Sequence, residues 1–136
     1  MDIHLDHINE FVSWALFGLI WIVQLVHYPS FRYVASDRFA AFHQHHTRSI
    51  SFVVLPLMLA ELGLGITLVW QSDLDWRYII ALVIVGLIWA STFLIQVPDH
   101  NALGRGKDDQ LIDRLVKTNW IRTILWTIKA LWLFVL

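Results

Sequence analysis

Residues 76–97 read WRYIIALVIVGLIWASTFLIQV, and Pro98 follows directly. The only charged residue in this run is Arg77. A helix of about 20 apolar residues is long enough to cross the hydrocarbon layer of a bilayer, which is about 30 Å thick. The run is therefore predicted to be a membrane-spanning helix that ends at the proline.

Three further apolar stretches predict three more spans. They cover about residues 11–28, which Pro29 follows, about 37–70 and about 108–136. The second of these is too long for a simple span, so its first turns are expected to stand outside the membrane, and Pro56 is expected to kink it. Short connections place consecutive spans antiparallel. The expected fold is all-α: one domain, residues 1–136, that forms an up-down-up-down bundle of four transmembrane helices.

The composition of the whole chain also favours a membrane protein. Of the 136 residues, 57% are hydrophobic and 15% are charged, whereas a soluble domain usually has about 45–50% and about 25%. A domain this small cannot bury so much apolar surface, so the expected partner is the lipid bilayer. The absence of cysteine excludes disulfides and thiolate metal ligands. A formal net charge of −1 argues against a nucleic-acid partner.

Basic residues are distributed unevenly around the predicted spans. Eight lie in or near the two connections that follow the first and third spans: Arg32, Arg38, Arg48, Arg105, Lys107, Arg114, Lys117 and Arg122. Only Arg77 lies near the opposite ends of the spans. Because basic residues concentrate on the cytoplasmic side, we expect a protein integral to the cytoplasmic (inner) membrane. Both termini are expected outside, and the two basic connections in the cytoplasm.

The two predicted hairpins resemble each other in short segments. Gln24 and Gln96 lie near the ends of the first and third spans. Arg48 and Arg122 lie near the beginnings of the second and fourth spans, and their separation in the sequence is almost the same as that of the glutamines. Parallel repeats of this kind occur in membrane proteins. Two repeated hairpins and a chance match both explain these similarities.

Polar side chains from all four spans are predicted to lie at the cytoplasmic end. They are Gln24, His27, His43, His45, His46, Gln96, His100, Asn119 and Arg122. Polar groups in or near a bilayer are costly, so they tend to face the bundle interior and to mark functional sites. We therefore predict a shared polar pocket. The alternative is that these residues lie at helix ends because water and headgroups are near.

Four of the histidines are candidate metal ligands. His43 and His46 are three residues apart and share a helix face, whereas His45 points nearly the opposite way. With His27 and His100 from neighbouring spans, a site of three or four imidazoles is geometrically possible. Such ligands suit iron, copper or zinc rather than magnesium or calcium.

The same histidines allow a second kind of cofactor. Two imidazoles from different helices can ligate a haem iron. Haem fits this chain less well than a metal ion, because it needs flat room that Trp89, Trp120 and Trp126 would crowd. The cofactor is therefore unknown, and a transition metal and haem are both open.

Two ionisable residues are expected deeper in the membrane. Glu61 follows His46 in the second span by roughly 22 Å along a helix axis. At that depth its expected partner is Lys129 of the last span, in a buried ion pair. The alternative is that Glu61 carries protons or anchors a substrate. Arg122 likewise needs a carboxylate or an anionic ligand, because a guanidinium stays charged.

Three short motifs lie where the predicted spans meet the cytoplasmic side. They are His27-Tyr28-Pro29, Pro98-Asp99-His100-Asn101 and Asn119-Trp120-Ile121-Arg122-Thr123. In these motifs the chain resembles the anthrone-oxygenase-like family of small four-helix membrane proteins, which shows a His-Pro pair, a Pro-x-Asn element and an Arg-Thr pair. Tyr28 and the Asp99-His100 pair depart from that pattern. The matching positions are His27, Pro29, Asn101, Arg122 and Thr123.

The resemblance implies an oxidoreductase or oxygenase that acts on a lipophilic aromatic or quinone-like substrate without an obligatory cofactor. In such a site His27 or His46 would act as general base. Arg122 and Asn119 would stabilise an enolate or phenolate oxygen.

Other interpretations of the polar cluster stay open. Gln24, Gln96 and Asn101 are candidate cofactor-binding residues. The protein could instead be a non-enzymatic membrane subunit or small transporter whose cluster binds an anion, a metal or haem. Two copies of so thin a bundle could also pair and enclose the site.

Overall fold

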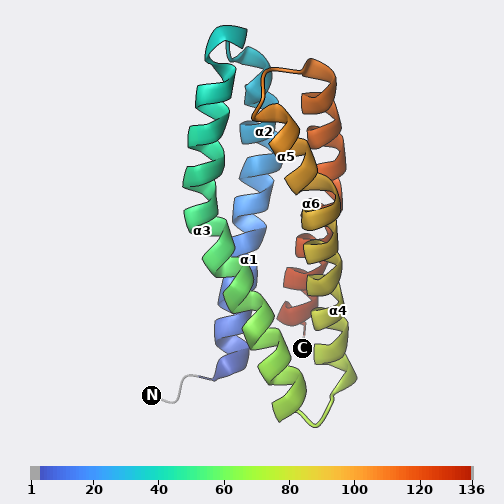
Figure 1. Cartoon of the computed structure of the whole chain (residues 1–136). Helices are drawn as coiled ribbons and strands as arrows, with labels where there is room; N and C mark the ends of the chain where they lie inside the picture. Colours follow the sequence, from blue (N-terminus) through green and yellow to red (C-terminus); the bar gives the residue numbers. More distant parts are fainter. Residues whose placement is uncertain (1–3, 136) are drawn as a thin grey trace.

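The computed structural model describes residues 4–135, and all regular structure within them is helical. Four long helical rods form a bundle (Figure 1). The first rod comprises α1 (Leu5–Ile22), a π-helical turn (Val23–His27), α2 (Tyr28–Ser30) and a 3₁₀ turn (Phe31–Tyr33), and the second is α3 (Ser36–Gln71). The third comprises α4 (Trp76–Ser91), a π-helical turn (Thr92–Gln96) and α5 (Val97–Leu103), and the fourth is α6 (Asp109–Phe134). The predicted all-α, four-helix fold is confirmed.

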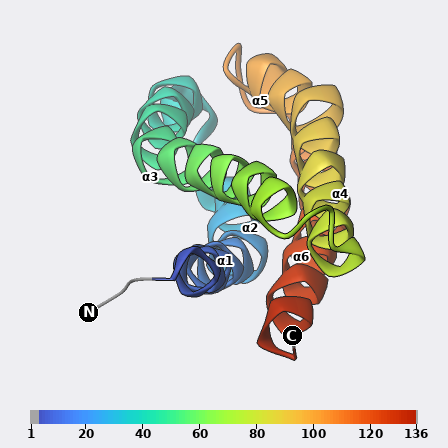
Figure 2. The same ribbon diagram turned by 90° about the horizontal axis from the view of Figure 1, so that it is seen from below.

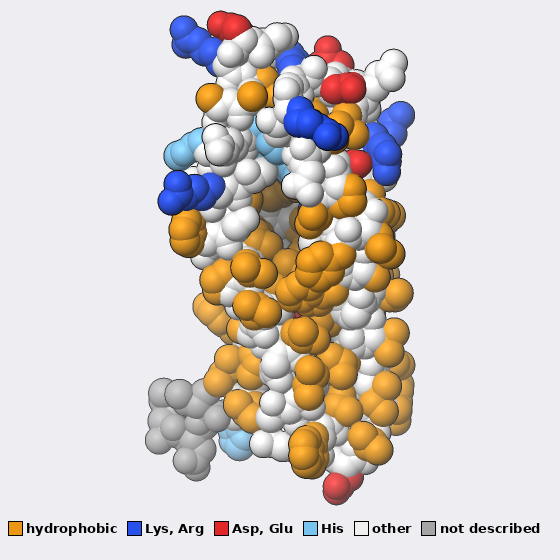
Figure 3. Space-filling model, in the orientation of Figure 1, with side chains coloured by type: hydrophobic (Ala, Val, Ile, Leu, Met, Phe, Trp, Pro, Cys, Tyr) orange, Lys and Arg blue, Asp and Glu red, His pale blue; other side chains and the backbone are white. Residues whose placement is uncertain are grey.

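Three of the four rods are long and apolar enough to cross a membrane. They are residues Leu5–Tyr33, Ser36–Gln71 and Trp76–Leu103. Figure 3 shows hydrophobic side chains over most of the visible face below a charged end. Exposed apolar surface of this extent is stable where lipid covers it.

The fourth rod differs in composition although it lies alongside the others (Figure 1). Its 26 residues extend over about 39 Å at about 1.5 Å per residue. Asn119, Arg122 and Lys129 are buried on its inner face, which lowers its average hydropathy. A fourth span therefore remains a prediction.

The structure corrects the predicted ends of the first and third spans. Neither rod stops at its proline, because helical structure continues past Pro29 to Tyr33 and past Pro98 to Leu103. A π-helical turn lies directly before each proline-containing segment. A proline lacks an N–H, and its ring clashes with the carbonyl four residues earlier. The wider turn relieves that clash and lets the rod continue.

The two π-helical turns lie at equivalent places in the two hairpins. The spacing from Val23, where the first turn begins, to Pro29 equals the spacing from Thr92, where the second turn begins, to Pro98. The paired glutamines do not keep this spacing, since Gln24 lies near the beginning of its turn and Gln96 at the end. The first rods of the two hairpins therefore share a π-helical turn at the same distance before a proline, but the two glutamines occupy different positions in that turn.

The second rod matches its predicted range closely. It begins at Ser36 and ends at Gln71. It contains Pro56 and changes direction along its length (Figures 1 and 2). The short turn that follows is fixed by Asp75, which accepts a hydrogen bond from the Arg77 backbone N–H at 2.9 Å and pairs with its guanidinium. Hydrogen bonds from Arg77 lower the pKa of the Asp75 carboxyl below its usual value of 3.8.

A buried ion pair joins the lower halves of three rods. Lys129 Nζ of α6 lies 2.9 Å from Glu61 Oε1 of α3, and both side chains are buried. Trp126 Nε1 donates to Glu61 Oε2 at 3.0 Å, and Lys129 also donates to Ser13 Oγ of α1 at 2.6 Å. The predicted Glu61–Lys129 pair is therefore confirmed.

Both ends of the described chain lie at one end of the bundle (Figure 1). The connections after Tyr33 and after Leu103 lie at the opposite end, where Lys and Arg side chains gather in Figure 3. The fold thus brings the basic segments together at one end. Which side of a membrane that end faces stays a prediction.

Candidate functional site

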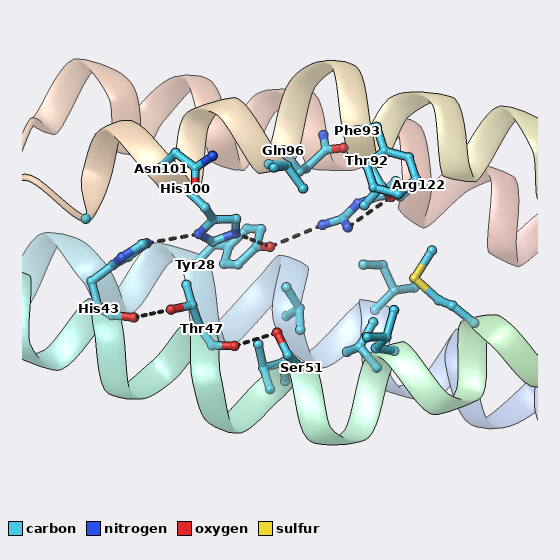
Figure 4. Close-up of a pocket in the computed structure, with 18 of the residues that line it drawn as sticks. Tyr28, His43, Thr47, Ser51, Thr92, Phe93, Gln96, His100, Asn101 and Arg122 are labelled. Atoms are coloured by element: carbon cyan, nitrogen blue, oxygen red, sulfur yellow. Dashed lines mark hydrogen bonds between the residues drawn. The ribbon is translucent and has the colours of Figure 1, made fainter.

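A chain of hydrogen bonds links side chains from all four rods near the basic end (Figure 4). Arg122 Nη2 of α6 donates to the Tyr28 hydroxyl oxygen of α2 at 3.1 Å. The Tyr28 oxygen lies 2.9 Å from His100 Nε2 of α5. His100 Nδ1 in turn lies 2.9 Å from His43 Nε2 of α3.

The donors and acceptors in this chain have one assignment that satisfies every group. Arg122 is a donor only, so the Tyr28 oxygen accepts from it. The buried Tyr28 O–H then donates to His100 Nε2, because the described residues offer it no other acceptor. His100 must carry its proton on Nδ1 and donate it to His43 Nε2. In this assignment all three hydrogen bonds are donated in the direction from Arg122 to His43.

An amide clamp holds Arg122 in place from the side of α6. Asn119 Oδ1 accepts from Arg122 Nε at 3.0 Å and also from Nη2. Asn119 Nδ2 donates to Gln24 Oε1 at 2.8 Å, and Thr123 Oγ1 donates to the same oxygen at 3.2 Å. Gln24 Nε2 donates to the Val116 carbonyl. The predicted residues Gln24 and Asn119 therefore position the arginine rather than face an open space.

His27 and His46 form a second pair, which is not part of the hydrogen-bond chain from Arg122 to His43. His27 Nε2 lies 2.6 Å from His46 Nδ1. A hydrogen bond between two imidazole nitrogens needs one lone pair, so the two rings cannot both be fully protonated. His46 Nε2 is buried and has no hydrogen-bond partner among the described residues.

The imidazoles are arranged in pairs rather than around one point. The pairs are His27 with His46 and His43 with His100. Among residues 4–135, no group of three or more His, Asp or Glu side chains is placed to hold a metal ion. Each of the four rings turns a nitrogen towards its partner, and the expected site of three or four imidazoles stays a prediction. Binding of a metal or haem remains a prediction without geometric support.

His45 lies outside all of these contacts. It is exposed on α3, whereas His43 and His46 are buried. The helical spacing predicts that His43 and His45 point to nearly opposite sides of α3, and the structure shows that His43 is the one that faces the interior.

A cavity of about 840 Å³ lies between α3 and the rod that contains α4 and α5. Figure 3 shows the hollow on this face of the molecule, and Figure 4 shows side chains that line it. The polar lining includes Tyr28, His43, Thr47, Ser51, Thr92, Gln96, His100, Asn101, Arg105 and Arg122. The apolar lining includes Leu19, Ile20, Val23, Ile50, Val54, Leu55, Met58, Trp89, Phe93, Val97 and Trp126.

The cavity divides the predicted site residues into two groups. His43, Gln96, His100, Asn101 and Arg122 line it. Gln24, His27, His46 and Asn119 do not, because they point into contacts among the π-helical turn Val23–His27, α3 and α6. Asn101 is exposed at the rim, and Gln96 is buried, with its Oε1 accepting from Ser91 Oγ at 3.0 Å.

Sequence reasoning missed Tyr28, Thr92 and the two tryptophans of the cavity wall. In the sequence Tyr28 is only a departure from a His-Pro pair, yet it bridges Arg122 and His100. Trp89 and Trp126 enter the sequence argument only as obstacles to haem. A hydroxyl-bearing residue next to a proline at the end of a span is the one signal that could have pointed to Tyr28.

In comparisons with known proteins, no family model, no curated protein and no solved structure matches the chain. The fold and the site define it as a small helical protein with candidate membrane spans and a buried histidine cluster.

Proposed function

We propose that the protein is a small integral membrane oxidoreductase or oxygenase that binds a lipophilic aromatic or quinone-like molecule between α3 and α5. The observation that carries this proposal is the cavity of about 840 Å³ with apolar walls and one polar end. Its volume lies in the range of small-molecule sites, about 300–1,000 Å³. The resemblance to the anthrone-oxygenase-like family supports the same substrate class.

The mouth of the cavity favours entry from the lipid. Leu55, Phe93 and Val97 line the cavity and are also exposed on the outer surface. A lipophilic molecule could pass between these side chains without crossing a charged surface. The aromatic body would then lie against Trp89 and Trp126, with an oxygen directed to Arg122.

The chemistry that this arrangement supports is proton removal beside a fixed positive charge. Arg122 would stabilise negative charge on a substrate oxygen. The chain Tyr28–His100–His43 would accept the proton. In this proposal the base function belongs to that chain rather than to His27 or His46, since neither of those two lines the cavity. Dioxygen would be the oxidant in the oxygenase form of the reaction.

Ligand binding can be measured by tryptophan fluorescence, because Trp89 and Trp126 line the cavity. Protein in lipid nanodiscs should show saturable quenching by an alkylated naphthoquinone. Ser51→Phe places a large side chain in the cavity and should weaken binding by about tenfold or more, the effect of losing about 1.4 kcal/mol. Ser49→Phe is the matched control, because Ser49 is exposed on the same helix and does not line the cavity. Quenching that does not saturate, or equal effects of both variants, would reject the site.

Turnover separates an enzyme from a binding subunit. Protein supplied with a reduced, phenolic form of the ligand should consume dioxygen and yield an oxidised product by mass spectrometry. Saturable binding without oxygen consumption would favour the non-enzymatic alternative. Metal analysis and an absorption spectrum of the same sample test the prediction of a metal or haem.

A further inference from the structure

Arg122 is the one buried charge of the described residues that no opposite charge compensates. The other buried charged side chains are Glu61, Asp99 and Lys129. Glu61 and Lys129 pair with each other, and Asp99 lies 3.4 Å from Arg114. Arg122 is 6% exposed and takes part in none of the ion pairs.

All groups that Arg122 contacts are neutral. Asn119, Tyr28 and Thr92 accept its four hydrogen bonds, and the one from Nη1 to Thr92 is long at 3.5 Å. A guanidinium has five N–H donors and cannot give up its charge in a protein. At least one Nη1 donor is therefore available beside Thr92, which also lines the cavity.

The charged lining of the cavity is entirely basic. Arg105 lies in its outer part and Arg122 at its buried end, and no Asp or Glu is among the lining residues that the structure describes. A buried cation inside apolar helices is costly unless an anion neutralises it. A cavity whose charged lining consists of two arginines attracts anions.

We propose that the cavity binds its ligand as an organic anion, with an oxyanion on a lipophilic body held by the Arg122 guanidinium. This inference rests on the proposed function, which supplies the lipophilic ligand, and adds that the polar end of that ligand is negatively charged. An ionised phenol, an ionised hydroxyquinone and a carboxylate share that chemistry. A neutral quinone lacks it and leaves Arg122 uncompensated.

A matched pair of probes isolates the charge. A 2-hydroxy-3-alkyl-1,4-naphthoquinone is an acid that ionises, whereas the 2-methyl compound with the same alkyl chain has no acidic hydroxyl. In nanodiscs of phosphatidylcholine at neutral pH, the hydroxy compound should quench tryptophan fluorescence with an affinity at least about tenfold higher. Its bound absorption spectrum should be that of the anion.

Substitutions at Arg122 assign the preference to that side chain. Arg122→Gln should abolish the difference between the two probes, and Arg122→Lys should retain part of it because the charge remains. Arg38→Gln is the control, since Arg38 is exposed and does not line the cavity. If Arg122→Gln fails to fold, the comparison of the two probes in the unaltered protein still decides.

The outcomes distinguish this inference from the function on which it rests. Equal affinities for the two probes in the unaltered protein would overturn the anion and leave the lipophilic site standing. Binding of neither probe would overturn both. An oxyanion could also come from a lipid headgroup, so the titration is repeated in phosphatidylglycerol discs. Competition there would assign the oxyanion to lipid, and an unchanged affinity would assign it to a free ligand.

Discussion

Tyr28 shows how a single residue can set the geometry of this site. It stands between His27 and Pro29 in the sequence, is buried, and takes a hydrogen bond from Arg122. Among the described residues, its hydroxyl is the only group that connects that arginine to His100. The polar link from Arg122 of α6 to His100 of α5 therefore depends on one side chain from α2.

Glu61 and Lys129 give a residue-scale test of how charge is held in the lower half of the bundle. Each is buried and contacts the other at 2.9 Å. Glu61→Gln and Lys129→Met should each destabilise the fold by about 3–5 kcal/mol, because one charge is left unpaired. The double substitution should recover part of that loss. Thermal unfolding in nanodiscs measures the effect, and additive losses would show that the pair contributes no coupling.

The Glu61–Lys129 pair could be predicted from the sequence, whereas the cavity could not. Depth along a helix depends only on residue number, so two lone ionisable groups at the same depth are expected to meet. Which imidazole faces which depends on helix rotation, and a π-helical turn changes that rotation. His43 and His46 could be assigned to one face of α3, but His100 follows such a turn. Residue spacing in the sequence therefore could not predict that His100 pairs with His43 rather than with His46.

At the scale of the elements, the π-helical turns decide how side chains are presented to the cavity. The turn at Thr92–Gln96 separates Trp89 on α4 from His100 on α5. A π turn accommodates one more residue than an α-helical turn does. Because an α-helix advances about 100° per residue, loss of the π turn would rotate the side chains of α5 relative to those of α4. The sequence signals this element only by Pro98, and a proline alone indicates the end of a helix as readily as a π turn.

Pro98→Ala tests whether the proline maintains the turn. Alanine restores an N–H and removes the clash with the earlier carbonyl, so regular α-helical bonding becomes available across residues 92–98. The resulting rotation should carry His100 away from Tyr28 and His43. Binding of the hydroxynaphthoquinone should weaken several-fold while the circular dichroism of the helices is unchanged. Unaltered binding by Pro98→Ala would show that packing, not the proline, holds the turn.

At the scale of the whole molecule, the four rods leave one side of the bundle open. α1 packs against both α3 and α6, and α4 packs against both of the same helices. Towards the basic end α3 and α5 diverge (Figure 2), and the cavity lies between them. The sequence predicts four antiparallel rods from their length and short connections. It could not predict this gap, because the gap arises from how the rods tilt.

Membrane orientation is the remaining whole-molecule property, and the distribution of basic residues predicts it. The connections after Tyr33 and after Leu103 lie at the end where Arg32, Arg105 and Lys107 are found, opposite both termini (Figure 1). Basic segments that flank spans stay in the cytoplasm, so both termini should be outside. Alkaline phosphatase fused after the last residue should then be active, and the same enzyme inserted at Gly106 should be inactive. Activity only at Gly106 would reverse the orientation and place the mouth of the cavity in the outer leaflet.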